Sequence, residues 1–127
     1  MENVHSNPSH INVHQRNFLF RNPFVNLLFE VQEANEKGET ALHFAAHQTD
    51  SAITQILLQN GIDVNHVDKE GNTALLIATD AQNYSVIELL LDQSAIDINR
   101  PNNHLHTPFM VATWKKDLKL MKTLFEK

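Results

Sequence analysis

The sequence predicts an all-α solenoid built from repeated pairs of short helices, and two observations support this fold class. First, residues 40–46 align with residues 73–79 at an offset of 33, and these align with residues 107–113 at an offset of 34. Second, each unit contains two short apolar segments of helical period, separated by a polar break. A helix pair this short cannot bury its apolar face alone, so it must stack on its neighbours.

Composition limits the class of protein further. The chain has 127 residues, the size of one domain, and its 42% apolar content is sufficient for folding. It has no cysteine, which excludes a disulfide framework, thiolate metal ligands and a cysteine nucleophile. No apolar run approaches the roughly 20 residues of a membrane helix, and the N-terminus lacks a secretory pattern. We therefore expect a cytoplasmic monomer that does not bind a membrane.

The segment before the repeats is expected to form an N-terminal cap. Residues 1–17 have little apolar content and no period, and they predict a flexible polar tail. Residues 18–34 predict a capping helix, because Asn22-Pro23 is followed by apolar residues at helical spacing. A rival register aligns residues 24–31 with residues 57–64 and makes this segment a degenerate repeat. That register places Pro23 inside a helix, which is costly.

The three repeats are expected at about residues 35–67, 68–101 and 102–127. In each repeat a threonine opens the first helix and caps its free N–H groups (Thr40, Thr73 and Thr107). An acidic or amide residue is expected to cap the second helix (Asp50, Asn83 and Asp117). That helix is apolar at helical spacing: Ile53, Ile56 and Leu57, then Val86, Leu89 and Leu90. Lysines in the last repeat predict a solvated outer face.

Several blocks in these repeats resemble the ankyrin-repeat family. They are the Thr40-x-Leu42-His43 block, the paired leucines, the block Gly61-Ile62-Asp63-Val64-Asn65, and Asp68-x-x-Gly71-x-Thr73. The resemblance covers about residues 35–127. It implies antiparallel helix pairs stacked in an L-shaped array, with short hairpin fingers projecting to one side.

The sequence departs from the family pattern at two points. The family histidine is present only as His43, with Leu76 and Met110 at the equivalent positions. In the family this ring links the threonine hydroxyl to neighbouring backbone. The finger before the third unit has Leu105 where the preceding finger has Gly71. We expect that finger to be less regular than the others, or reshaped for a partner.

The resemblance also implies where a partner protein binds. In the family, the fingertips and the exposed end of each first helix line a concave contact face. Matching position by position gives the candidate partner-binding residues: Glu36, Lys37, Glu39, His47 and Gln48 in the first unit, Val67, Lys69, Glu70, Asn72, Asp80 and Ala81 in the second, and Pro101, Asn103, His104, His106, Trp114 and Lys115 in the third.

Trp114 differs from the residues at its equivalent positions, His47 and Asp80, which are polar. An exposed tryptophan on a rigid helix is a typical hot-spot anchor for a protein partner. In the alternative interpretation, Trp114 folds inward and seals the end of a short array. Acidic finger residues such as Glu70 would steer a partner with basic patches toward the face.

Other chemistry finds little support in the sequence. His43 and His47 have the spacing of a zinc-protease pair but lack its glutamate, and His104-x-His106 fits partner contact better than metal. His5, His10 and His14 fall in the predicted tail. Residues 1–114 carry 13 acids and 5 bases (−8), whereas residues 115–127 carry 5 lysines and 2 acids (+3). This basic end lacks the interleaved aromatic residues of a single-strand binder. We expect no nucleic-acid binding.

The sequence therefore predicts a non-catalytic protein–protein interaction module with no cofactor and no metal. It contains no nucleophile paired with a base and no glycine-rich phosphate loop. In the alternative, the chain is a substrate-recruiting or targeting adaptor of an enzyme system, such as a bacterial or viral effector acting in a host cytoplasm.

Overall fold

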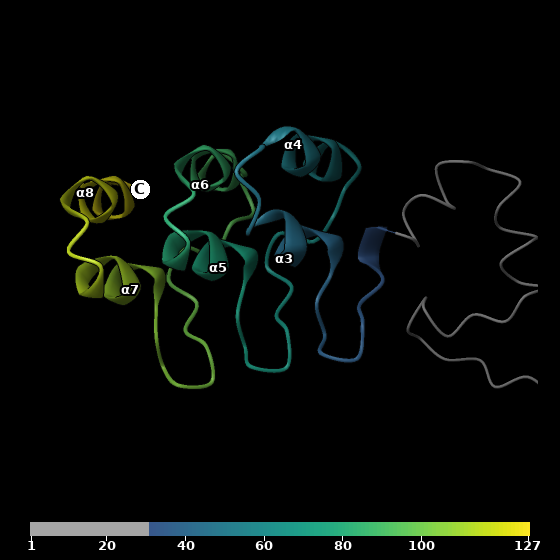
Figure 1. Cartoon of the computed structure of the whole chain (residues 1–127), viewed down its shortest axis with the longest axis horizontal. Helices are drawn as coiled ribbons and strands as arrows, with labels where there is room; N and C mark the ends of the chain where they lie inside the picture. Colours follow the sequence, from purple (N-terminus) through teal and green to yellow (C-terminus); the bar gives the residue numbers. More distant parts are fainter. Residues whose placement is uncertain (1–30) are drawn as a thin grey trace, which may run out of the picture.

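The computed structural model describes residues 31–127 as helices joined by turns, without a strand in this part of the chain. The helices form three consecutive pairs and two layers (Figure 1). One layer holds the first helix of each pair: α3 (Ala41–Ala45), α5 (Ala74–Asp80) and α7 (Pro108–Trp114). The other holds the second helices: α4 (Ala52–Gln59), α6 (Tyr84–Leu91) and α8 (Leu118–Glu126). The predicted all-α solenoid is confirmed.

Threonine caps fix the start of each first helix, as the sequence predicts. The Thr73 hydroxyl accepts a hydrogen bond from the backbone N–H of Leu76, and the Thr107 hydroxyl accepts one from Met110. In the first repeat, the backbone N–H of Thr40 donates to Nδ1 of His43 at 3.2 Å. All three first helices therefore begin at equivalent places, which keeps them in register for stacking.

The predicted caps of the second helices are only partly correct. Asp117 caps α8 by accepting from the N–H of Leu120, and it also accepts from the hydroxyl of Tyr84 and the amide of Gln82. These hydrogen bonds, led by that from Tyr84, lower the pKa of Asp117. They also join the second repeat to the third.

The other two predicted caps lie at the starts of their helices but make other bonds than Asp117 does. Asn83 precedes α6, but its side chain donates to the carbonyls of Ala46 and Gln48 in the first repeat. Ser51 is the N-cap residue of α4, but the carboxylate of the predicted Asp50 accepts from the backbone N–H of Ala52, the first residue of that helix, at 2.9 Å. Asn83 is the N-cap residue of α6, as predicted, but its side-chain oxygen accepts from the hydroxyl of Ser85 and not from a backbone N–H of the helix. Its amide nitrogen instead satisfies carbonyls beyond the end of α3, which lack partners within a helix.

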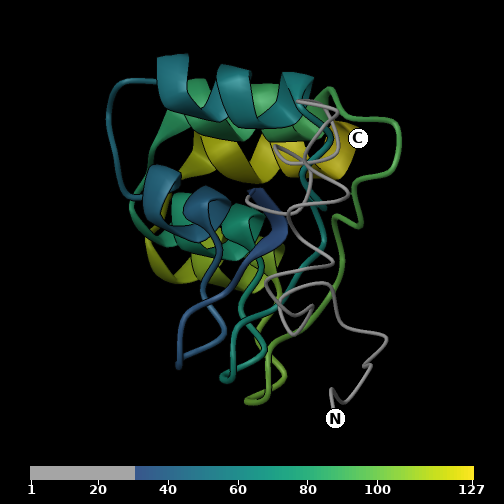
Figure 2. The same ribbon diagram turned by 90° about the vertical axis from the view of Figure 1, so that its right-hand side faces the viewer.

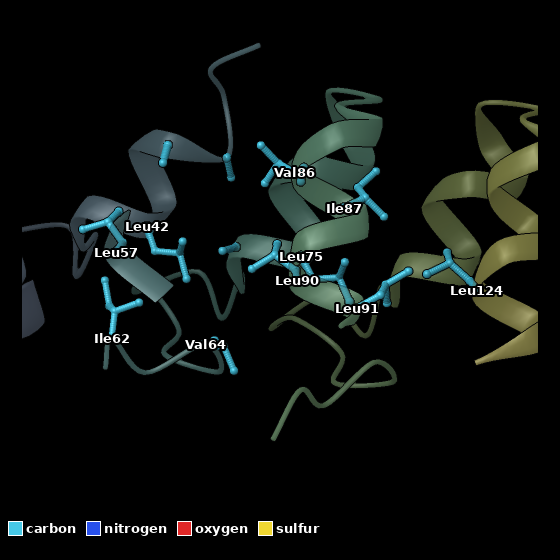
Figure 3. Close-up of a cluster of buried hydrophobic side chains, with 14 of the residues drawn as sticks. Leu42, Leu57, Ile62, Val64, Leu75, Val86, Ile87, Leu90, Leu91 and Leu124 are labelled. Carbon is cyan, nitrogen blue, oxygen red and sulfur yellow. The ribbon is translucent and has the colours of Figure 1, made fainter. Parts of the chain in front are cut away.

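A continuous apolar core runs between the two layers (Figure 3). Leu75, Val86 and Leu90 of the second repeat are fully buried, and Leu42 and Leu124 extend the cluster into the outer repeats. Small residues at the closest approach of the first helices, such as Ala78 and Ala112, are buried as well. Each repeat thus buries its apolar stripe only by contact with the next one.

Three fingers project from the layer of first helices, at residues 35–39, 68–72 and 102–106 (Figure 2). At the base of each, one side-chain oxygen accepts two backbone N–H bonds from the tip. In the second finger, Asp68 accepts from Glu70 and Asn72, each at 2.9 Å. Asn35 and Asn102 make the equivalent pairs of bonds in the first and third fingers. Backbone bonds also link successive fingers.

The third finger is as regular as the others, so the predicted irregularity was wrong. Leu105 adopts the left-handed conformation at φ 65°, which Gly38 and Gly71 adopt at φ 77° and 81° in the other fingers. Leu105 accepts this conformation because Asn102 supplies the same hydrogen bonds as Asp68. The leucine side chain is 73% exposed. The finger therefore keeps its geometry and carries an apolar side chain at its tip.

The lysines of the third repeat are exposed, as predicted, but large apolar side chains that the sequence did not single out are exposed beside them. Phe125 is 82% exposed, whereas Leu91 at the equivalent position of the second repeat is buried under the third. Phe109 and Met110 are also exposed, although Leu75 and Leu76 at their positions are buried. Phe125 shares α8 with the exposed Lys119 and Lys122, whereas Phe109 and Met110 lie on α7.

Two apolar residues of α4 are more exposed than predicted. Ile53 and Ile56 are 49% and 58% exposed, while Leu57 on the same helix is buried. Leu120, which occupies the position of Ile53 in the last repeat, is buried although no further repeat follows it in the structure. This position therefore faces the preceding helix pair, and the described residues contain no helix pair before α4.

The predicted tail at 1–17 and most of the capping helix at 18–34 lie outside the described residues. Val31 and Gln32 are helical. The side chain of Gln32 bonds the carbonyl of Gly61 at 2.7 Å and the N–H of Asp63 at 3.1 Å. Asn65 makes the same two bonds to Ala95 and Asp97 one repeat later. The side chain of Gln32 therefore bonds to the next unit in the same way as the side chain of Asn65 does one repeat later.

Candidate functional site

The fingers and the first helices enclose a hollow of about 340 Å³, which we call the concave groove. Residues of α5 and α7, with His47 just beyond α3, line one side, and residues of the three fingers line the other. Its lining consists of Glu39, His47, Asp68, Glu70, Asn72, Leu76, Ile77, Asp80, Asn102, His106, Val111 and Trp114. The groove is thus built from all three repeats, and stacking fixes its shape.

The groove is acidic. Four of its lining residues are carboxylates, Glu39, Asp68, Glu70 and Asp80, and none of its described lining residues is a lysine or an arginine. The Asp68 carboxylate is engaged with the finger backbone, and Glu39 accepts from the side chain of Asn35 at 2.9 Å. Glu70 makes no side-chain hydrogen bond or ion pair among residues 31–127. Its charge is therefore available to a partner.

Trp114 lies at the end of α7 and is 56% exposed, so the alternative in which it folds inward is wrong. The ring of His106, from the third finger, meets it edge-on with ring centroids 4.6 Å apart. Asp80 on the neighbouring helix forms an ion pair with Lys115 at 3.5 Å. The histidine ring thus contacts the tryptophan ring nearly at a right angle, while more than half of the residue stays open to solvent.

His43 anchors the first helix to the second finger. Its Nε2 lies 2.9 Å from the carbonyl oxygen of Asn72, and only a protonated Nε2 can donate to that oxygen. Nδ1 therefore accepts from the N–H of Thr40. His66, which meets His43 edge-on at 5.8 Å, bonds in turn to the carbonyl of Gly38 in the first finger. Two histidine rings thereby fix the spacing of two fingers.

Burial lowers the pKa of His43, although the bond to Asn72 acts in the opposite direction. Because the unfolded chain binds a proton more readily than the folded one, the neutral ring stabilises the fold above about pH 6.5. We expect this stabilisation to be lost as the pH falls below that value. Urea unfolding at pH 7.5 and 5.5 should show a larger loss of stability for the native chain than for His43→Leu. Equal losses would contradict this role of His43.

The structure brings together seven of the predicted partner-binding residues in the groove: Glu39, His47, Glu70, Asn72, Asp80, His106 and Trp114. Glu36, Lys37 and Lys69 line a second hollow between the tips of the first two fingers. The other predicted residues lie outside both hollows: Gln48, Val67, Ala81, Pro101, Asn103, His104 and Lys115. Among these, Asn103 links the third finger to the second through the Lys69 carbonyl.

Sequence reasoning missed the floor of the groove. Leu76 and Val111 are buried, Ile77 is half-buried, and all three line it from α5 and α7. Position-by-position matching selected fingertips and helix ends, and so it excluded residues at the centre of a helix. Asp68 and Asn102 were also missed, although their equivalent places at the start of each finger would have indicated them.

Within residues 31–127, no group of three or more histidine, aspartate or glutamate side chains is arranged to hold a metal ion. No helix in the same part of the chain is long and apolar enough to cross a membrane. The chemistry that the groove does offer is an aromatic ring, the carboxylate of Glu70 and an apolar floor.

Comparison with known proteins defines the class of protein that these features represent. The profile of ankyrin repeats in three copies matches residues 17–102, more than half of the chain. The chain therefore belongs to the ankyrin-repeat family. This family is generally a protein-interaction fold without catalysis. The match begins before residue 35, where we expected the first repeat.

Particular relatives come from viruses and bacteria. The chain is 42% identical over 53 residues to the interferon antagonist OPG040 of Vaccinia virus (strain Western Reserve), covering 42% of this chain and 19% of that protein. It is 32% identical over 80 residues to the putative ankyrin repeat protein YahD of Escherichia coli (strain K12), covering 63% and 39%. It is 30% identical over 92 residues to the putative ankyrin repeat protein FPV014 of Fowlpox virus (strain NVSL), covering 72% and 21%.

The matched segments span between about a fifth and two fifths of these relatives' lengths. The similarity thus concerns the repeats and not the whole of any relative.

Proposed function

We propose that this chain is a non-catalytic module that binds a partner protein in its concave groove. The observation that carries the proposal is the convergence of three repeats on one hollow that contains an exposed tryptophan and an unpaired glutamate. Large aromatic side chains at the centre of a contact face supply much of the binding energy between proteins. Stacked repeats hold such side chains in place beforehand, which reduces the entropy cost of binding.

The same proposal places the chain inside a cell as a monomer, with no nucleic acid, cofactor or membrane as its ligand. The similarity to viral interferon antagonists favours a second candidate, an adaptor or effector that recruits a host protein. Both candidates use the same face, and they differ in the identity of the partner. A captured protein that belongs to a host enzyme system would favour the second candidate.

The test compares two variants of the full chain that carry matched changes. One combines Trp114→Ala with Glu70→Lys in the groove. The other combines Phe125→Ala with Glu88→Lys, which removes an exposed aromatic ring and reverses an exposed charge on the layer of second helices. Each variant is used as bait in a eukaryotic cell extract, and bound proteins are quantified by mass spectrometry.

We expect the groove variant to lose the proteins that the native chain captures, by tenfold or more, because an aromatic hot-spot side chain contributes about 2 kcal/mol or more. The control variant should retain them. Thermal unfolding of both variants verifies that each is folded. Retention by the groove variant, with loss by the control, would place the contact on the opposite layer and refute the proposal.

A further inference from the structure

We propose that the concave groove recognises an arginine side chain of its partner, held between the ring of Trp114 and the carboxylates of Glu70 and Asp80. This inference rests on the proposed function and adds the chemistry of the bound segment. Three features of the groove support it: its charge, its aromatic wall and its apolar floor.

The charge of the groove selects a cation. Its described lining has four carboxylates and no lysine or arginine, and the lysine that pairs with Asp80, Lys115, lies outside the lining. Glu70 has no partner among residues 31–127, and Asp80 is 70% exposed with one ion pair at 3.5 Å. Both carboxylates can therefore accept hydrogen bonds from an incoming donor.

The aromatic wall selects a flat cation. Among aromatic side chains, that of tryptophan binds a positive charge over its ring face most strongly. Its ring is 56% exposed, and the edge-on contact with His106 at 4.6 Å restrains its orientation. A guanidinium group can stack on such a ring and donate two parallel bonds to a carboxylate, which an ammonium group cannot do.

The floor and the size of the groove suit the remainder of the side chain. Leu76, Ile77 and Val111 present apolar atoms to the hollow. The methylene stem of an arginine packs on apolar surface while its charged end reaches polar groups. A volume of about 340 Å³ is at the small end of ligand pockets, so it suits one inserted side chain rather than a folded surface.

The test uses three short peptides that differ at one position, with arginine, lysine or citrulline between flanking glycine and serine residues. Citrulline has the shape of arginine without its charge. Trp114 is the only tryptophan, so its fluorescence reports binding to the full chain directly. We expect a saturable change with the arginine peptide, weaker binding of the lysine peptide, and at least tenfold weaker binding of citrulline.

Matched variants locate the binding site. Glu70→Gln should lower the affinity for the arginine peptide about tenfold, whereas Glu36→Gln should change this affinity less than twofold. Both substitutions remove one exposed carboxylate, but Glu36 lies outside the groove. Trp114→Leu should weaken binding of the arginine peptide more than binding of the citrulline peptide, because the substitution keeps apolar area and removes the aromatic ring. Calorimetry measures both affinities.

Three results would overturn the inference: no saturable change with arginine, equal binding of citrulline, or equal weakening by Glu70→Gln and Glu36→Gln. Any of these is distinguishable from failure of the proposed function. Suppose that a protein is captured through the groove and that an excess of the arginine peptide does not displace it. This result would support the proposed function and refute recognition of arginine.

Discussion

Gly71→Ala is expected to destabilise the fold by about 2–4 kcal/mol, although it adds a single methyl group. Gly71 has φ 81°, and a left-handed conformation costs a residue with a Cβ atom about 1–2 kcal/mol. In addition, the new Cβ would lie 2.8 Å from the backbone nitrogen of Asn103 and 2.5 Å from its Oδ1. The backbone nitrogen belongs to a fixed finger and cannot move away like a flexible side chain.

The same overlap should affect the neighbouring finger. Asn103 donates from its backbone to the carbonyl of Glu70 at 3.0 Å and from its side chain to that of Lys69 at 2.9 Å. Displacing Asn103 weakens both bonds, so the third finger should separate from the second. Urea unfolding measures the loss of stability, and amide exchange at Asn103 measures the local opening.

Leu105→Gly provides the matched control, because Leu105 occupies the equivalent place in the third finger at φ 65°. Its side chain is 73% exposed, so its removal exposes little buried apolar surface to water. This substitution relieves the left-handed strain and should raise stability by up to about 1 kcal/mol. If Gly71→Ala costs less than about 0.5 kcal/mol, the tight approach of the two fingers in the structure is wrong.

The repeat pattern alone predicted most of the fold, because helix starts depend on local chemistry. Thr73 and Thr107 cap the helices that directly follow them, and Asp117 caps α8. Such bonds join residues about three positions apart, and sequence order determines them. The phase of the repeats then determines which apolar residues face the core.

What the sequence did not predict depends on competition between distant groups. Asn83 is the predicted N-cap residue of α6, but the sequence did not predict that its amide also bonds the carbonyls of Ala46 and Gln48 in the first repeat. Leu105 looks like a break in the finger, but Asn102 and the link to the second finger hold it in the same turn. The carbonyls that bind Asn83 and the second-finger carbonyl that binds Asn103 lie in other repeats, whereas Asn102 is local to the third finger.

The candidate site was also predictable only in part from the sequence. The exposed ends of the first helices were predictable, and Trp114 was distinguished by its apolar character at a position that is polar in the other repeats. The floor of the groove was not predictable, because Leu76 and Val111 read as ordinary core residues. Leu76 and Val111 pack into the stack of helices and also line the groove.

Leu90→Ala is expected to cost about 3–4 kcal/mol, within the range of about 2–5 measured for buried leucine truncations. Leu90 is fully buried on α6, in the middle repeat (Figure 3). A chain of this size has about 5–15 kcal/mol of stability in total, so this one change removes a large part of it. Chemical unfolding monitored through Trp114 fluorescence and helical circular dichroism measures the loss.

Leu124→Ala is the matched control, because it makes the same truncation at the equivalent position of the third repeat. Leu124 is 5% exposed and has a stacked repeat on one side only in the structure, so its cavity can relax more readily. We expect a cost of about 2 kcal/mol there, at the low end of the same range.

The two variants should also differ in cooperativity, because stability in a solenoid is a sum of repeats and the interfaces between neighbours. Leu90→Ala weakens the repeat that joins the other two, so unfolding of the outer repeats should separate and the transition should broaden. Leu124→Ala weakens one end and leaves the remaining interface intact. Equal losses with equally sharp transitions would show that this chain unfolds as a single globular core, because position in the stack would then have no effect.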